Sequence, residues 1–410
     1  MIKISYKWIA LALLWVTYFL LQGTRQIYGA TLPQIKADFC TDDMQMGLVA
    51  SAFFMCYAIA VPFGGLAADF LRRKWVVVAG SALFAVGIFL SSFVATTGLM
   101  VITYGILNGV GQSLVPTSST SIIQQLHAES RATALSIYQL GLYAGIILCS
   151  VAAGYLGSLD AGGWRKAFIL FGGIGLLWAI VLAVFLRNTP HVDNGVKTKP
   201  SFKDALLSIF VKPSAILMTF AFGLSNFGDI GFRTWMPAFM QRTFVDMTPA
   251  SAAFHSVFWF YSGGFLGILA GGRLSDKWMR NGCVGARLNC NLIGLLLCAP
   301  CAFVAVNIVD GLASLALALA VYGFVHGFYD ANFIVSFYEV ITPRYRTAAY
   351  GLFACGAFAI GSASPAVLGM LSSVFSFKQS LSMIGVFYLA AALLTVIARV
   401  VFLKRDYERE

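Results

Sequence analysis

The sequence predicts an all-α membrane protein with twelve transmembrane helices in two pseudo-symmetric six-helix bundles. Three observations predict it: the composition, a series of apolar segments of membrane-spanning length, and an internal repeat. Of the 410 residues, 59% are hydrophobic and only 11% are charged, whereas soluble proteins carry about 25% charged residues. The 28 basic and 17 acidic residues are too few to cover several soluble cores with a charged surface.

Twelve segments are apolar over the roughly 20 residues that a helix needs to cross a bilayer. Six precede a polar stretch, at 6–33, 44–70, 75–95, 99–124, 132–157 and 164–186. Six follow it, at 213–241, 250–274, 284–307, 312–339, 347–373 and 378–403. The first segment carries no small-residue cleavage pattern, so we expect a retained span.

Basic residues predict the orientation. Loops on one side, together with both termini, hold 20 lysines and arginines, and the opposite loops hold five. Because cytoplasmic loops are enriched in basic residues, we expect both termini in the cytoplasm, in a bacterial inner membrane. The net charge of +11 therefore indicates the lipid bilayer as a partner and not nucleic acid. We predict an amino-terminal bundle over 1–186, a cytoplasmic linker over 187–212 and a carboxy-terminal bundle over 213–410.

The two predicted bundles share sequence motifs in the same order. Gly64-Gly65-Leu-Ala-Ala-Asp69 recurs 207 residues later as Gly271-Gly272-Arg-Leu-Ser-Asp276. Tyr104-Gly105-Ile-Leu-Asn108-Gly109 recurs 218 residues later as Tyr322-Gly323-Phe-Val-His326-Gly327. A third pair, Arg131-Ala-Thr-Ala and Arg346-Thr-Ala-Ala, is separated by 215 residues. Ordered repeats of this kind are typical of duplicated transporters.

The first of these motifs resembles the signature loop between helices two and three of the major facilitator superfamily. The resemblance is carried by Gly65, Asp69 and the basic cluster at 72–74, and it departs from the family pattern at Phe70 and Arg72. A glycine permits close helix approach, and a carboxylate at a helix end can accept hydrogen bonds from free amides of another helix. We therefore predict that this loop and its repeat act in gating. The candidate gating residues are Gly65, Asp69, Arg73, Arg131, Gly272, Asp276 and Arg346.

A few ionisable residues lie at membrane depth, where each is energetically costly and so a functional candidate. Arg25 and Asp229 each precede a proline by eight residues, at equivalent places in the first and seventh spans, and Arg233 lies one turn beyond Asp229. We predict that the three form a central cluster whose surplus positive charge binds an anion, because a guanidinium grips a carboxylate or phosphate at two points. The alternative is a structural Arg25–Asp229 ion pair, with Arg233 reaching the outer interface. Three nearby aromatics complete the predicted binding site: Tyr28, Trp235 and Tyr329.

The tenth span carries His326, Asp330 and Glu339. A carboxylate in an apolar setting holds its proton more tightly, so Asp330 is the first candidate for proton coupling and Glu339 the second. His326 is either a third participant or a hydrogen-bonded packing residue. We expect no cofactor and no metal site, since no His, Cys or carboxylate cluster has ligand spacing.

The pattern from Arg25 to Tyr57 resembles the organic anion:cation symporters that take up sugar acids, and also the organophosphate:phosphate antiporters and the spinster-type transporters. The resemblance implies a secondary transporter of a small organic anion, with Arg25 in the binding site. It departs at Thr24 and Gln112, where the symporters commonly carry acids, which places proton coupling in the carboxy-terminal half. A neutral sugar symporter, an organophosphate antiporter and a lipid or drug exporter are the alternatives. We expect a monomer, and no polar constellation suggests an enzyme.

Overall fold

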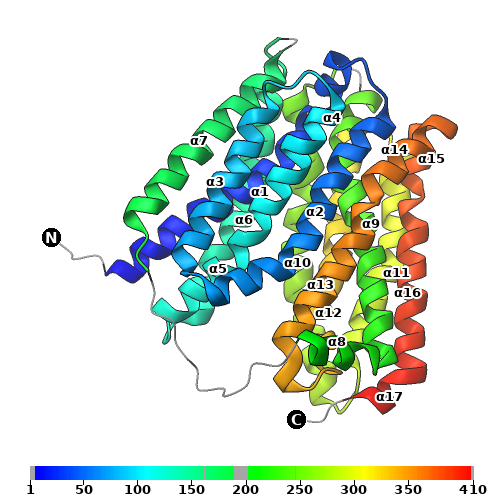
Figure 1. Ribbon diagram of the computed structural model, residues 1–410. Helices are drawn as coiled ribbons and strands as arrows, with labels where there is room; N and C mark the ends of the chain where they lie inside the picture. The colour runs from blue at the N-terminus through cyan, green and yellow to red at the C-terminus, as the bar shows by residue number, and fades with distance from the viewer. Residues whose placement is uncertain (1–4, 161, 189–201, 245, 408–410) are drawn as a thin grey trace. The chain divides into compact units, whose positions relative to one another are not determined.

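The computed structural model describes residues 5–160, 162–188, 202–244 and 246–407, and these are almost entirely helical (Figure 1). The chain divides into two compact units. Unit 1 comprises Met1–Asn194, Arg233–Phe254 and Pro365–Met370. Unit 2 comprises Gly195–Phe232, His255–Ser364 and Leu371–Glu410.

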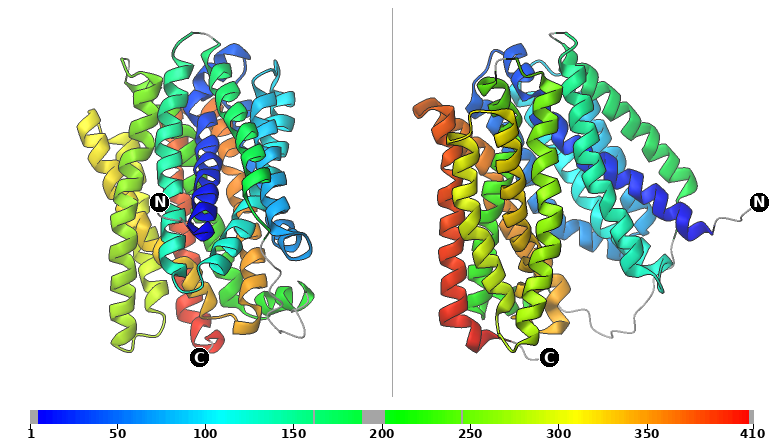
Figure 2. Two further views of the ribbon diagram at one scale, coloured as in Figure 1. Left: turned by 90° about the vertical axis from the view of Figure 1, so that its left-hand side faces the viewer. Right: turned by 180° about the vertical axis from the view of Figure 1, so that it is seen from behind.

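The amino-terminal helices form most of unit 1. They are α1 (Tyr6–Asp38), α2 (Asp43–Phe70), α3 (Arg73–Ser91), α4 (Thr97–Met100), the π-helix η1 (Val101–Asn108), α5 (Gly109–Leu126), α6 (Arg131–Gly157) and α7 (Gly163–Phe185). Helix α1 lies against α6, α3 against α7, and α2 against η1 and α5 (Figure 2). Pro33 lies inside α1, which continues to Asp38.

The remaining helices begin with the short α8 (Phe202–Phe210), which precedes the long helices of the second half. Those are α9 (Pro213–Thr243), α10 (Pro249–Arg280), α11 (Ala286–Asn307), α12 (Leu312–Tyr338), η2 (Pro343–Tyr345), α13 (Arg346–Ser362), α14 (Ser364–Val374), α15 (Phe377–Ser382), α16 (Ile384–Ile397), η3 (Ala398–Phe402) and α17 (Leu403–Asp406). Within unit 2, α11 packs on both α12 and α16.

Twelve helical stretches among the described residues are long and apolar enough to cross a membrane, which confirms the predicted fold class. Each corresponds to one of the twelve predicted segments, and most boundaries agree within a few residues. The largest differences are the continuation of α1 beyond Pro33 and of α10 to Arg280. These differences arise because the apolar pattern marks only the part of a helix that lies in the hydrocarbon core of the bilayer. The helix itself continues until its backbone groups find other hydrogen-bond partners.

The repeated Tyr-Gly-x-x-x-Gly motif performs the same packing in both halves. A Cβ added to Gly109 would lie 2.6 Å from the carbonyl oxygen of Phe53 on α2. A Cβ added to Gly327 would lie 2.6 Å from the carbonyl oxygen of Gly264 on α10. In each half the absence of a side chain therefore brings the second and fourth spans into backbone contact, as small residues do between membrane helices.

The signature motif also packs alike in both halves, but through its first glycine. A Cβ on Gly64 would lie 2.8 Å from the Ser113 carbonyl oxygen of α5, and a Cβ on Gly271 would lie 2.7 Å from the Phe328 Cα of α12. Gly272, the predicted gating glycine of the second copy, has open space at its Cβ position. The expectation of close approach is therefore wrong at Gly272, because the helix turns that residue away from α12. Position 65 lies in α2, but its surroundings fall outside the described part of the structure.

Candidate functional site

Arg25 of α1 is held by a buried amide on α5. Its Nε donates to Gln112 Oε1 at 2.5 Å. The Gln112 Nε2 group donates to Thr24 Oγ1 at 3.1 Å and to Asn108 Oδ1 at 2.9 Å. Gln112, Asn108 and Thr24 each have 0% of their surface exposed. Asn108 ends the π-helix η1, and such widened turns alter the direction of the side chains that follow.

The rest of the Arg25 guanidinium faces aromatic rings. Its central carbon lies 4.4 Å from the ring centroid of Tyr57 and 5.7 Å from that of Phe53, both on α2. Its Nη2 is buried and makes no hydrogen bond, and no carboxylate among the described residues of unit 1 pairs with it. The predicted cation at Arg25 is thus in place, with one donor group left over.

Two of the aromatic residues predicted for the binding site are buried and hydrogen-bonded to the backbone of other helices. Tyr28 is 2% exposed, and its hydroxyl donates to the Met46 carbonyl oxygen at 2.6 Å. Trp235 is 0% exposed, and its indole nitrogen donates to the Pro365 carbonyl oxygen at 3.1 Å. Both use their polar atoms to fix helix backbones of unit 1, and both rings are buried.

Asp229 and Arg233 both lie on α9, one turn apart and half-buried. Arg233 belongs to unit 1, with Arg25, whereas Asp229 belongs to unit 2. Because the positions of the two units relative to each other are not determined, the predicted cluster of these three residues stays a prediction.

The predicted proton-coupling residues of α12 divide into two places. His326 Nδ1 lies 3.1 Å from Asp330 Oδ2, and the Asp330 side chain is 40% exposed against 8% for His326. The carboxylate expected to stand alone therefore has an imidazole partner. Four aromatic rings have centroids within 6.5 Å of the His326 ring: those of Phe260, Tyr322, Tyr329 and Tyr388. Tyr329 is 3% exposed and stacks on Phe333.

Glu339 follows the last residue of α12 and faces the start of α11. Its Oε1 lies 3.0 Å from Arg287 Nε, and Arg287 Nη2 lies 3.8 Å from Asp276 Oδ1 at the end of α10. Burial raises the pKa of Glu339 to about 7, although the Arg287 charge opposes this. The sequence reasoning treated Arg287 only as a loop charge, yet it links the predicted gating residue Asp276 to Glu339.

The other predicted gating residues have more local roles. Arg346 Nε donates to the carbonyl oxygens of Tyr338 and Ile341 at 3.1 and 3.2 Å, so it satisfies backbone groups at the end of α12. Arg131 is exposed at the start of α6. Arg73 begins α3, with Nε and Nη1 buried and without hydrogen bonds. The side chain of Asp69 lies outside the described residues.

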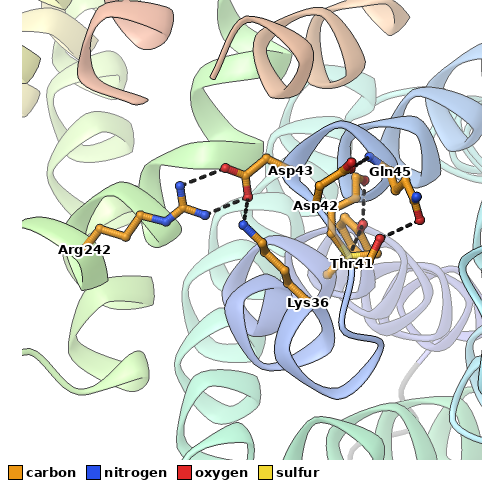
Figure 3. A network of polar contacts seen from close by, with 8 residues as sticks. Lys36, Thr41, Asp42, Asp43, Gln45 and Arg242 are labelled. Atoms are coloured by element: carbon orange, nitrogen blue, oxygen red, sulfur yellow. Dashed lines mark hydrogen bonds and ion pairs between the residues drawn. The ribbon is translucent and has the colours of Figure 1, made fainter. Parts of the chain in front are cut away.

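A cluster of charges that the sequence reasoning missed lies where α1 meets α2 (Figure 3). Asp43 accepts from Lys36 Nζ at 2.7 Å and from Arg242 Nη1 and Nη2 at 2.9 and 2.7 Å. Asp42 caps α2 by accepting from the Gln45 amide at 2.7 Å, which sets Asp43 in the first helical turn. One feature of the sequence could have indicated this cluster. Lys36 and Arg242 are two of the five basic residues in the loops opposite the termini, where an acidic partner for each could have been sought.

The same end of α2 packs closely on the start of α14. Side chains at Gly47 and Gly369 would collide with the carbonyl oxygens of Pro365 and Asp43, respectively. Ser51 Oγ accepts from the Ala366 amide at 3.0 Å. We call these contacts of Asp43, Gly47 and Ser51 with Arg242 and residues 365–369 the α2 seam. All of them lie within unit 1.

Among the described residues, twelve helices long and apolar enough to cross a membrane, with the half-buried Arg25 and a histidine–carboxylate pair inside them, are typical of a polytopic membrane transport protein. Among the described residues, no three His, Cys, Asp or Glu side chains converge as a metal site would require. Residues 14–363 match the family model of the Major Facilitator Superfamily, and the chain belongs to that family. That family consists of transporters and not of enzymes.

Curated relatives fall in several branches of the family. The chain is 26% identical over 301 residues to protein spinster homolog 1 of Xenopus laevis, which covers 69% of this chain and 56% of that protein. It is 28% identical over 288 residues to a hexuronate transporter of Bacillus subtilis (strain 168), covering 64% of each. It is 27% identical over 196 residues to a probable sulfoacetate transporter of Cupriavidus necator, covering 47% of this chain and 45% of that one. The matches thus span about half to two thirds of these relatives.

Solved structures show the same fold. A bacterial homologue of the human lysosomal transporter Spinster, in an inward-facing and unoccupied conformation, superposes with a TM-score of 0.87 at 18% identity over 100% of both chains. The nucleoside transporter NupG superposes with a TM-score of 0.75 at 16% identity over 97% of this chain and 100% of that one. At such identities the likeness concerns the fold.

Proposed function

We propose that this chain is a secondary active transporter that takes up a small organic anion, such as a sugar acid, by alternating access. The observation that carries the proposal is Arg25. Its guanidinium is held by the neutral Gln112, has no carboxylate partner among the described residues of unit 1, and keeps one nitrogen without a hydrogen bond. A cation of this kind is costly inside a membrane, and an anionic ligand offsets that cost.

Two relatives support the substrate class. A hexuronate carries a carboxylate and a sulfoacetate carries two acidic groups, and the chain resembles transporters named for both. A neutral sugar would leave the Arg25 charge uncompensated, so we place it second. The likeness to spinster proteins supports a third candidate, export of an amphipathic solute, for which apolar surface would matter more than Arg25.

We further propose that transport is coupled to protons through the His326–Asp330 pair. The two side chains are in contact within a span, and histidine is the side chain that ordinarily gains and loses a proton near neutral pH. Asp330 is partly exposed, as a group that loads and releases protons must be. The orientation with both termini in the cytoplasm of a bacterium and the monomeric state belong to the same proposal.

Uptake into proteoliposomes tests the proposal. We expect galacturonate or sulfoacetate, but not neutral galactose, to accumulate when the external pH is lower than the internal pH. Arg25→Ala should abolish binding of the acids, and Arg25→Lys should retain part of it because a lysine keeps the charge but loses the two-point fork. Asp330→Asn should remove gradient-driven accumulation while leaving exchange of internal for external substrate. Tight binding of neutral sugars that survives Arg25→Ala would instead favour the neutral-sugar candidate.

A further inference from the structure

We infer that Gln112 is a positioning residue that fixes Arg25 for an ionised acid group and makes anion binding in unit 1 independent of protonation. This inference rests on the proposed function and concerns the same site. Gln112 departs from the acid that related symporters commonly carry at this place, and the inference gives it a role.

The hydrogen bonds fix the direction of both amides. Arg25 can only donate, so the Gln112 oxygen must face it. The Gln112 NH2 group then faces Thr24 Oγ1 and Asn108, and the Asn108 oxygen must face Gln112. Thr24 donates its own hydroxyl proton to the Leu21 carbonyl oxygen at 3.0 Å. Each orientation follows from the one before it. The starting point is that the guanidinium of Arg25 contains only hydrogen-bond donors.

This chain of bonds leaves donors without acceptors. Asn108 Nδ2 and Arg25 Nη2 are both buried and make no hydrogen bond. A buried donor without a partner is destabilising, and the described neighbours offer no acceptor to either group. A site that ends in surplus donors is complementary to a ligand made of acceptors, such as a carboxylate or sulfonate.

Among the described residues of unit 1, none of the groups that contact Arg25 is a carboxylate or an imidazole. Its immediate polar partners are amides and a hydroxyl, which do not titrate. The other polar side chains that face it from the surrounding helices are tyrosines. They are Tyr18 on α1, Tyr57 on α2 and Tyr104 on η1. The positive charge of Arg25 is therefore constant between pH 5.5 and 8.

A glutamate in place of Gln112 would change this. Its carboxylate would sit beside Arg25 and compete with the anion for the guanidinium. An anion could then bind well only if the new carboxyl took up a proton, since two anions in one buried site repel each other. Binding would become linked to proton uptake and would weaken as the pH rises.

The test is isothermal titration of galacturonate and sulfoacetate into purified wild type, Gln112→Glu and Gln112→Leu between pH 5.5 and 8. For Gln112→Glu we expect the slope of log Kd against pH to exceed the wild-type slope by up to one, with binding at least about tenfold weaker at pH 8. For Gln112→Leu we expect binding about tenfold weaker at every pH, with the wild-type slope, because the Arg25 guanidinium loses the hydrogen bond to Gln112 that fixes its position. Comparing slopes between variants removes any proton linkage contributed by Asp330, which is present in all of them.

The matched control is Gln124→Glu, the same chemical change on an exposed side chain near the end of α5, which should leave slope and affinity unchanged. Melting temperatures identify a variant that fails to fold, and the other variant then decides the outcome. Equal slopes in wild type and Gln112→Glu, or undiminished binding by Gln112→Leu, would overturn the inference but leave the proposed function standing. A folded wild type that binds neither acid would overturn the proposed function, and the inference with it.

Discussion

Asp43 holds the α2 seam together, and neutralising it should release the seam. Asp43→Asn removes the charge that accepts three hydrogen bonds from Lys36 and Arg242. Removing one partner of a fully buried ion pair costs about 3 to 5 kcal/mol. Here the lysine and arginine side chains are 31% and 34% exposed, so water partly replaces the lost carboxylate and we expect a loss of about 2 kcal/mol. That amounts to a shift of about 30-fold toward conformations in which the seam is open.

Thiol labelling measures the seam directly. Ser51→Cys places a thiol at the Ala366 contact, in a background where the exposed Cys40 is replaced by serine. We expect Asp43→Asn to raise the labelling rate of Cys at this position by a membrane-impermeant maleimide by about 30-fold, the ratio that corresponds to about 2 kcal/mol. High salt should raise the rate in the parent, because partly exposed ion pairs are screened.

The matched control is Asp160→Asn, which breaks the Lys166–Asp160 pair. Both of its side chains are about half exposed, at 53% and 47%, so its loss should leave labelling unchanged. An Asp43→Asn variant that labels less than about threefold faster than the parent would refute the reasoning, since a seam worth about 2 kcal/mol cannot open so little.

Two further predictions concern stability. Because burial raises the pKa of Glu339 from 4.5 to about 7, the folded protein keeps a proton that the unfolded chain loses, so stability should fall as the pH rises between these values. Glu339→Gln should flatten the fall of melting temperature with pH. Asp276→Asn, at a side chain that is 62% exposed, should leave that fall unchanged. Equal profiles for wild type and Glu339→Gln would contradict the raised pKa of Glu339. Gly271→Ala should cost about 1 to 3 kcal/mol, because its Cβ meets the α12 backbone. Gly272→Ala, with open space around it, should be neutral or stabilising by up to about 1 kcal/mol through helix propensity, and reversed melting temperatures would argue against the packing described.

Local patterns predicted most of the fold. Apolar length marked the twelve spans, because a helix in lipid must satisfy its backbone internally whatever its neighbours are. The repeated Tyr-Gly-x-x-x-Gly motif marked the internal repeat, and the structure adds that Gly109 and Gly327 make the same kind of backbone contact in each half. In the second copy of the signature motif the close approach is made by Gly271 and not by Gly272, since the sequence does not reveal which of the two faces the neighbouring helix.

The candidate site was predicted in its charges but not in its partners. The sequence marked Arg25, His326 and Asp330 because ionisable residues inside a span are rare and costly. It did not indicate that Gln112, 87 residues away, would hold Arg25.

The sequence by itself determined twelve apolar segments of membrane-spanning length with a cation in the first of them, because length, hydropathy and residue type are local properties. Only the tertiary structure decided that Asp43 meets Arg242 across 199 residues, and that Arg287 joins Asp276 to Glu339. The physical reason is that such contacts depend on how each helix is rotated about its axis against its neighbours. Glycine contacts and buried polar groups set that rotation jointly, through pairs of helices far apart in the chain.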